Sequence, residues 1–241
     1  MLISTANRRV NMLQKWNDLP GVMRNEEVEK YFRILNKKKK SLISKRAFDL
    51  TLASCLLLFA SFFMLVVAIL IKSDSRGKVF YKQTRVTKNG KLFDIYKFRT
   101  MIENADKKGS LVTIDNDQRI TKIGKVLRKY RIDEVPQLLN IIKGEMTFVG
   151  TRPEVEYYVN QYSKEMYATL LLPAGVTSLA SIKFKNEQKL LNSSKGIEKT
   201  YVNEILPEKM KYNLKYLENY SFLGDMTIMI ETFVAVLKKG D

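Results

Sequence analysis

The sequence predicts an α+β fold that is mostly helical, with a small β-hairpin or sheet and one hydrophobic helix. Three observations predict it. Residues 50–71 form an apolar run without a charged residue, an Asn-Gly turn joins two strand-like runs, and most of the other elements are amphipathic helical patterns.

Composition limits the chemistry. The 241 residues include 42 Lys and Arg against 25 Asp and Glu, which gives a net charge of +17. Such a basic chain implies an anionic partner, either nucleic acid, an anionic lipid surface or a phosphorylated substrate. There is one cysteine, Cys55, and no histidine. The chain therefore lacks an internal disulfide, the usual general base and the commonest metal ligand, so catalysis must use carboxylates, Lys, Tyr, Ser or a hard cation.

The apolar run Leu50–Ile71 is long enough to cross a bilayer, which takes roughly 20 residues of helix. It follows a long polar stretch, so it is not a cleavable signal peptide. The alternative is a buried core helix, but soluble helices rarely stay apolar on all sides for six turns.

Basic residues flank this run on both sides, eight between positions 30 and 46 and seven between positions 72 and 91. Because Lys and Arg favour the cytoplasmic side, both flanks are satisfied if the segment enters the bilayer and returns to the same face. A simple span is the competing interpretation. Asp49 stands at the mouth of the run, where Lys45 and Arg46 can pair with it on one helical face.

The rest of the chain reads as a hairpin followed by helices. The Asn89-Gly90 turn predicts a hairpin that puts Lys97 and Arg99 on one face and Phe98 on the other. The other expected elements are strands at Lys78–Val86, Lys91–Met101 and Met146–Glu154 and helices at Ile120–Tyr130, Ile132–Gly144, Glu154–Met166 and Asp225–Lys239.

Two adjacent acids, Asp133 and Glu134, carry the chemical prediction. Pro136 is tolerated in a first helical turn, which puts Asp133 near the N-cap of a helix. Alone, the pair could simply cap the helix and complement its dipole. The basic residues expected near the pair favour a phosphate site. They are Arg128, Lys129, Arg131, Arg152, Lys97 and Arg99. Two carboxylates there can hold Mg²⁺ or attack phosphorus, so phosphoryl transfer fits without a histidine.

Four stretches resemble the bacterial sugar transferases, the monotopic polyprenyl-phosphate phosphoglycosyl transferases. They are KRAFDL (Lys45–Leu50), FDIYKFRTM (Phe93–Met101), DQRITKIGKVLRKYRIDEVPQLLN (Asp117–Asn140) and KGEMTFVGTRPE (Lys143–Glu154). They follow the family's order and spacing and cover about residues 45–185. Where the family usually breaks its membrane helix with Ser-Pro, this chain has Ser61-Phe62, which removes the strongest local cause of a bend.

The resemblance implies a reaction and its residues. Asp133 attacks the sugar-bearing phosphate of a UDP-sugar, UMP leaves, and polyprenyl (undecaprenyl) phosphate takes the phosphosugar from the aspartate. Glu134 matches the acid that holds Mg²⁺. Substrate-binding roles fall to Arg128, Arg152, Lys97, Arg99 and Glu154, and the entry of a re-entrant membrane helix falls to Lys45, Arg46 and Asp49.

The resemblance also implies an organisation. It comprises a basic extension (1–44), a membrane-associated helix (45–72), a catalytic domain (73–185) on the cytoplasmic face of the bacterial inner membrane, and a helical extension (186–241). Glycosyltransferases acting downstream are possible partners. The rival is a catalytically inactive basic protein at a membrane surface that binds anionic lipid or nucleic acid. No nucleic-acid motif is recognisable, so the interpretation includes no nucleic-acid partner.

Overall fold

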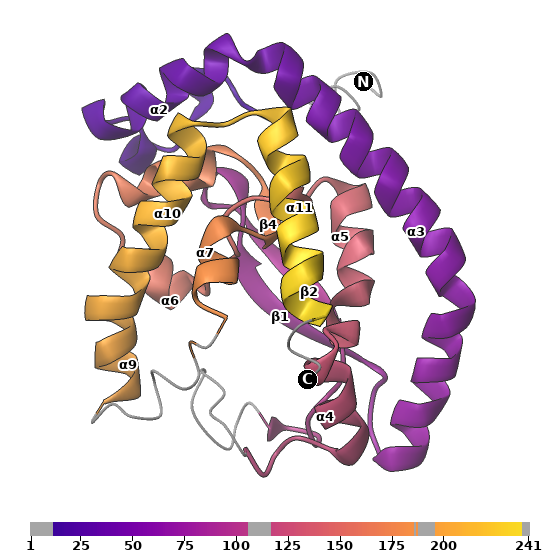
Figure 1. Cartoon of the computed structure of the whole chain (residues 1–241). Helices are drawn as coiled ribbons and strands as arrows, with labels where there is room; N and C mark the ends of the chain where they lie inside the picture. Colours follow the sequence, from indigo (N-terminus) through magenta and orange to yellow (C-terminus); the bar gives the residue numbers. More distant parts are fainter. Residues whose placement is uncertain (1–11, 106–116, 186, 188–195, 238–241) are drawn as a thin grey trace.

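Helices surround two small two-stranded sheets in the computed structural model, which describes residues 12–105, 117–185, 187 and 196–237 (Figure 1). The helices are α2 (Glu26–Lys37), α3 (Lys39–Asp74), α4 (Lys122–Lys129), α5 (Leu138–Lys143), α6 (Glu156–Val159), α7 (Leu179–Lys183), α9 (Ile197–Thr200), α10 (Leu206–Glu218) and α11 (Phe222–Leu237). The strands are β1 (Phe80–Val86), β2 (Leu92–Phe98), β3 (Met146–Val149) and β4 (Ala174–Thr177). The predicted α+β class, with one long apolar helix, is confirmed.

The predicted hairpin is confirmed. Strands β1 and β2 pair antiparallel, with Phe80 opposite Phe98. Asn89 and Gly90 both have left-handed backbone angles (φ 59° and 70°), which is the reason an Asn-Gly pair makes this turn. The alternation of β2 buries Phe98 against α3 and α4 and turns Lys97 to the opposite face, as predicted.

A second sheet was not predicted in full. Strand β3 falls inside the expected strand Met146–Glu154, but its parallel partner β4 has only four residues, too few to give a recognisable strand pattern. The two strands approach closely where Gly150 follows β3. A Cβ on Gly175 would collide with the backbone of Gly150, so this crossing requires a glycine.

Helix α3 runs along one side of the molecule as a single unbroken helix from α2 to α4 (Figure 1). It continues through Ser61 and Phe62, the place where the family usually breaks its membrane helix, in agreement with the missing proline. Near its end, Val67 and Ile71 pack with Phe98 and Leu127. Most of the large apolar residues between positions 56 and 70 are exposed, and the helix is long and apolar enough to cross a membrane.

The first turns of α3 are anchored inside the protein. The expected membrane-interface residues Lys45, Arg46 and Asp49 are all buried. The ammonium of Lys45 lies 2.8 Å from Asp225 of α11, and Arg46 donates hydrogen bonds to the last carbonyls of α5, Ile141 and Ile142.

The carboxylate of Asp49 accepts a hydrogen bond from Thr147 of β3, 4.0 Å from the Lys45 ammonium. The expected pairing of Lys45 with Asp49 is therefore a long contact, and the two residues face the protein core rather than the bilayer. The physical reason is α11, which brings the Asp225 carboxylate to Lys45, a residue that the sequence alone placed at the entry of the membrane segment.

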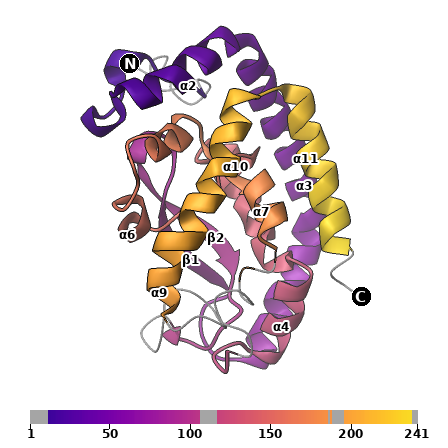
Figure 2. The ribbon, with the colours of Figure 1, turned by 60° about the vertical axis from the view of Figure 1, so that its left-hand side comes forward.

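The terminal segments belong to the core. From residue 12 onward, the segment expected as a basic extension buries Met23, Tyr31 and Leu35 in the largest hydrophobic cluster. Helix α10 adds Met210 and Leu217 to the same cluster. Figure 2 shows α10 in front of the β1–β2 hairpin and α11 beside it, with α3 behind α11; α11 also packs on β3 and β4. Both expected extensions therefore pack against the central part in the described part of the chain.

Both ends of α3 contact one globular body, so we expect its two flanks to lie on the same side of a membrane. The stretch between Arg46 and Ile71 would measure about 38 Å as helix, and a bilayer core is about 30 Å thick. If α3 crossed the bilayer, its two ends, and the globular body that both ends contact, would have to lie on opposite sides of it. In a Cys55→Ser background, Ile43→Cys and Lys78→Cys should react with an impermeant thiol reagent from the same face of sealed vesicles. Ile43 and Lys78 are exposed, which makes both positions suitable. Labelling from opposite faces would contradict this expectation.

Candidate active site

The two acids lie in a short 3-10 helix, Ile132–Gln137, that leads into α5. Pro136 lacks an N–H group and cannot continue an α-helical ladder, so the α-helix begins only at Leu138. The expected single helix Ile132–Gly144 is therefore two pieces, and Asp133 is not the N-cap of an α-helix. The turn starts at Arg131, whose backbone is left-handed (φ 58°), and Gly144 ends α5 as predicted.

One carboxylate oxygen of Glu134 forms ion pairs with three cationic side chains. Glu134 Oε1 lies 2.5 Å from Arg152 Nη2, 3.3 Å from Lys97 Nζ and 3.3 Å from Arg131 Nη1. Burial alone would raise the pKa of Glu134, but the charges of Arg152, Lys97 and Arg131 outweigh it and hold that pKa well below its ordinary value. Glu134 is therefore ionised at neutral pH and joins three chain segments.

The carboxyl group of Asp133 differs from that of the neighbouring Glu134 in its hydrogen bonding and in the direction of its pKa shift. Its side chain is 7% exposed, and its Oδ1 atom has no hydrogen-bond partner among the described residues. Burial and the negative charge of Glu134 raise the pKa of Asp133, while Lys97, Arg131 and Arg128 act in the opposite direction. A buried, unsatisfied carboxylate oxygen is costly, so its retention points to a use in ligand binding or catalysis.

Helix α4 brings Arg128 to the acids. Thr121 caps the helix by accepting a hydrogen bond from the Gly124 N–H group, and Gly124 leaves room for the backbone of Thr100 after β2. Arg128 Nε donates a 2.8 Å hydrogen bond to the Thr100 hydroxyl. This close approach of α4 and the hairpin holds the guanidinium near Asp133.

The loop after β3 brings Arg152. Its guanidinium also donates to the carbonyl of Val176 in β4, and the amide of Gly175 donates to the Thr151 carbonyl. The parallel β3–β4 pair therefore fixes the position of the loop. Together, Lys97, Arg128, Arg131 and Arg152 surround two carboxylates, so the cluster has a net positive charge suited to a diphosphate.

Two predicted substrate-binding residues lie outside this cluster. Arg99 donates hydrogen bonds to the carbonyls of Arg76, Ser75 and Ile71 and so caps the end of α3. Glu154 accepts a 2.6 Å hydrogen bond from Tyr201 and lies 3.6 Å from Lys209. The geometry thus gives both residues a structural role, and their predicted contact with substrate finds no support in it.

Sequence reasoning did not foresee the Arg131–Glu134 ion pair, and it overlooked Gln137, which lines a cavity beside this cluster. Arg131 was noted beside the acids, but without the role of pairing with Glu134 that the structure gives it. Gln137 received no role at all, although it follows Glu134 by three residues and so returns to the same side of a 3-10 helix. That spacing was the available signal.

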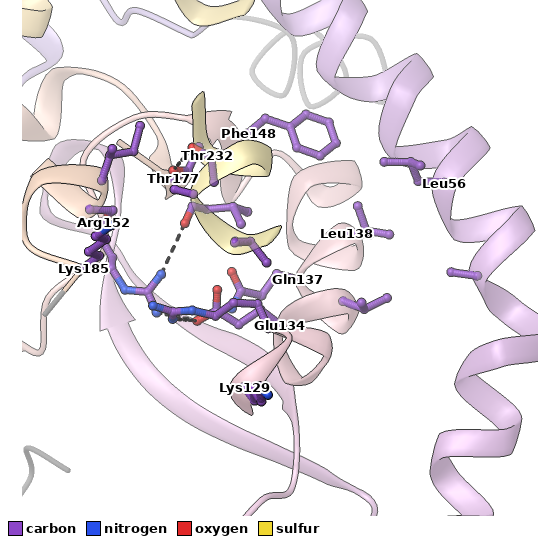
Figure 3. A pocket seen from close by; sticks show the side chains of 18 residues that line it. Leu56, Lys129, Glu134, Gln137, Leu138, Phe148, Arg152, Thr177, Lys185 and Thr232 are labelled. Atoms are coloured by element: carbon purple, nitrogen blue, oxygen red, sulfur yellow. Dashed lines mark hydrogen bonds and ion pairs between the residues drawn. The ribbon is translucent and has the colours of Figure 1, made fainter. Parts of the chain in front are cut away.

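A cavity of about 370 Å³ opens beside Glu134 (Figure 3). Glu134, Gln137 and Arg152 lie together on one side of it, while Leu138 and Phe148 lie toward Leu56 of α3. Asp133 does not line this cavity. The side chain is nevertheless surrounded by the cations described above and is not isolated from the polar cluster.

The donor set fits Mg²⁺ only together with a substrate. No three His, Cys, Asp or Glu side chains converge in the described ranges, so the protein offers no closed metal cage there. It does offer Asp133 and Glu134, with the unpartnered Oδ1 of Asp133 as a hard oxygen donor. Mg²⁺ is commonly held by one or two carboxylates plus substrate phosphates, and this pair matches that pattern.

Comparison with known proteins gives consistent results. The bacterial sugar transferase family model matches residues 40–239. A UDP-N-acetylgalactosamine-undecaprenyl-phosphate N-acetylgalactosaminephosphotransferase of Aeromonas hydrophila is 34% identical over 80% of this chain, which spans 43% of that protein. The exopolysaccharide production protein ExoY of Rhizobium meliloti is 34% identical over 82% of this chain and 88% of its own length.

A UDP-glucose:undecaprenyl-phosphate glucose-1-phosphate transferase of Klebsiella pneumoniae is 32% identical over 80% of this chain and 40% of its own length. The chain thus spans less than half the length of two of these three relatives and nearly all of ExoY. In all three, the matched region covers at least 80% of this chain. From the family match and these identities, the chain belongs to the bacterial sugar transferase family.

Proposed function

We propose that the protein transfers a sugar-1-phosphate from a UDP-sugar to undecaprenyl phosphate, with Asp133 as the nucleophile. The observation that carries the proposal is the buried, unpartnered oxygen of Asp133 beside Glu134 and four cationic side chains. The names of the Aeromonas and Klebsiella relatives, which both act on undecaprenyl phosphate, support the same reaction class.

In the first step, the cations bind the diphosphate of the donor. Arg128, Arg131 and Arg152 neutralise its charge and orient the sugar-bearing phosphate toward Asp133. The Asp133 oxygen forms a bond to that phosphorus, the bond from phosphorus to the bridging oxygen breaks, and UMP leaves with the electron pair. Glu134 stays ionised and holds Lys97, Arg131 and Arg152 in position.

In the second step, an oxygen of undecaprenyl phosphate attacks the phosphosugar carried on Asp133. The bond between phosphorus and the aspartate oxygen breaks and the carboxylate is restored, so no other reactant is consumed. Glu134 and Asp133 would hold Mg²⁺ together with the substrate phosphates, and the bound ion would supply charge neutralisation for the phosphoryl transfer.

The proposal includes a location. A UDP-sugar is water-soluble and a polyprenyl phosphate keeps its chain in the bilayer, so the site must lie at the cytoplasmic face of the bacterial membrane. The exposed apolar side of α3 would provide the attachment. The product would be the substrate of glycosyltransferases that build an exopolysaccharide or capsule.

The competing function is binding without catalysis at a membrane surface. The net charge of +17 is compatible with it. It does not account for a nearly buried Asp133 with an unsatisfied oxygen, because a surface that only binds anions has no use for that carboxylate. Catalysis is therefore the better explanation.

Asp133→Asn should lower UMP release from a UDP-sugar by a factor on the order of 10⁴ or more, as expected for loss of a nucleophile. Asp94→Asn, the same substitution on the exposed part of β2, should keep nearly full activity. Mass spectrometry of the wild-type protein incubated with donor alone should find the phosphosugar on Asp133. Wild-type levels of UMP release by Asp133→Asn would contradict the mechanism.

Glu134→Gln should lower Mg²⁺-dependent turnover by about 100-fold or more, because it removes the charge that both the metal and three cations require. Removal of divalent cations with EDTA should stop the wild-type enzyme, and Mg²⁺ should restore it. Titrating Mg²⁺ against turnover checks both statements. Full activity of Glu134→Gln at wild-type Mg²⁺ concentrations would remove Glu134 from the metal role.

The rate of UMP release should fall at acidic pH, with its midpoint above the ordinary Asp pKa of 3.8. Only ionised Asp133 can attack, and burial with the nearby Glu134 charge raises its pKa, so protonation inactivates it at higher pH than usual. Lys97→Met removes a charge that lowers this pKa, so the acid limb of the pH profile should move further up. Lys91→Met, on the exposed end of the hairpin, serves as control; an equal shift in both variants would refute this assignment.

A further inference from the structure

The cavity beside Glu134 has two chemically different ends. Part of its lining is apolar and comes from two helices, with Leu56 and Ala60 of α3 and Ala235 and Val236 of α11. Its inner end carries charge, from Lys129 among others. A ligand that fills it must therefore be hydrophobic along most of its length and anionic at one end.

Gln137 lies at the charged end of the cavity, and its side-chain amide makes no hydrogen bond with the described residues. The residue is 1% exposed, and both Nε2 and Oε1 lack a hydrogen-bond partner among the described residues. A side-chain amide buried without partners is rare in proteins and costs free energy unless a ligand or water satisfies it. Gln137 lines the cavity beside Glu134 and Arg152 (Figure 3).

We propose that this cavity binds the acceptor of the reaction, a lipid phosphate, whose chain passes between α3 and α11 and whose phosphate meets Gln137. This inference rests on the proposed function and adds to it a location and a binding residue. The Gln137 amide donates to a phosphate oxygen, and Lys129 and Arg131 at the same end of the cavity neutralise the charge.

The chemistry favours a lipid over the nucleotide donor. A uracil or a sugar needs many polar partners, whereas the side of the cavity between the helices is formed by alkyl side chains. The same helix α3 that lines the cavity exposes large apolar residues on its outer side, including Phe59 and Phe62. A lipid chain can therefore extend from the cavity along an apolar surface to the bilayer.

In this proposal, helix α11 takes part in binding the lipid chain. Thr232 lines the cavity and its hydroxyl lies 2.7 Å from that of Thr177 in β4, which fixes the helix over the site. Asp225, one turn from its start, pairs with Lys45 of α3. These contacts set the width of the gap through which the chain would pass.

The test separates the two half-reactions. Ala235→Phe places a ring in the cavity, and Gln137→Leu removes the amide while keeping similar bulk. Ile230→Phe is the matched control, because Ile230 is 65% exposed and does not line the cavity. Each purified variant in nanodiscs is assayed for UMP release without acceptor, for KM toward undecaprenyl phosphate, and for equilibrium binding of radiolabelled undecaprenyl phosphate.

We expect UMP release within about twofold of wild type in all three variants, and a rise of about tenfold in KM and Kd for undecaprenyl phosphate in the two cavity variants only. Thermal melting checks folding, and Gln137→Leu should not be destabilised, because it removes a buried polar group without a partner. Unchanged acceptor binding in both cavity variants, or a matching loss of UMP release, overturns the inference. Absence of UMP release in the wild type would instead refute the proposed function, while the binding measurement still tests the cavity.

Discussion

The arrangement of the site depends on one carboxylate oxygen, Oε1 of Glu134. Three cations from different parts of the chain meet there: Lys97 from the hairpin, Arg131 from the turn before the acids and Arg152 from the loop after β3. Buried charges of one sign repel each other strongly, and a buried anion without partners is equally costly. Glu134 resolves both problems at once, and the neighbouring Asp133 has no comparably close ion pair with any residue that the structure describes.

This division between adjacent acids resembles the way enzymes assign different tasks to two carboxylates. Glu134 is stabilised as an anion, whereas burial and the Glu134 charge raise the pKa of Asp133. A carboxylate with a raised pKa is a stronger nucleophile than a fully stabilised one, provided that it is ionised at the working pH. The surroundings of Asp133 therefore suit covalent chemistry better than those of Glu134 do.

Local signals in the sequence were sufficient for part of this structure. The Asn89-Gly90 turn determines the hairpin because its left-handed backbone angles depend on those two residues alone, and the apolar run Leu50–Ile71 predicts the long apolar helix. The sequence also indicated the four cations that lie near Asp133 and Glu134, although not how they pair: Arg128, Arg131, Arg152 and Lys97. Contacts between distant segments could not be predicted. Strand β4 is too short to be recognised from its sequence pattern, and Lys45 pairs with Asp225, which lies 180 residues away in the sequence.

A related limit explains why Arg99 was assigned to the substrate. A strand pattern shows which face an arginine takes but not that the end of a helix lies on that face, where the carbonyls of Ile71 and Ser75 accept its hydrogen bonds. The continuity of α3 has a further consequence. Because each residue turns a helix by about 100° and advances it by about 1.5 Å, deleting one residue from its exposed middle would swing Val67 and Ile71 out of their contacts while Lys45 stayed anchored. Across related sequences this segment should therefore vary freely in its side chains and hardly at all in its length.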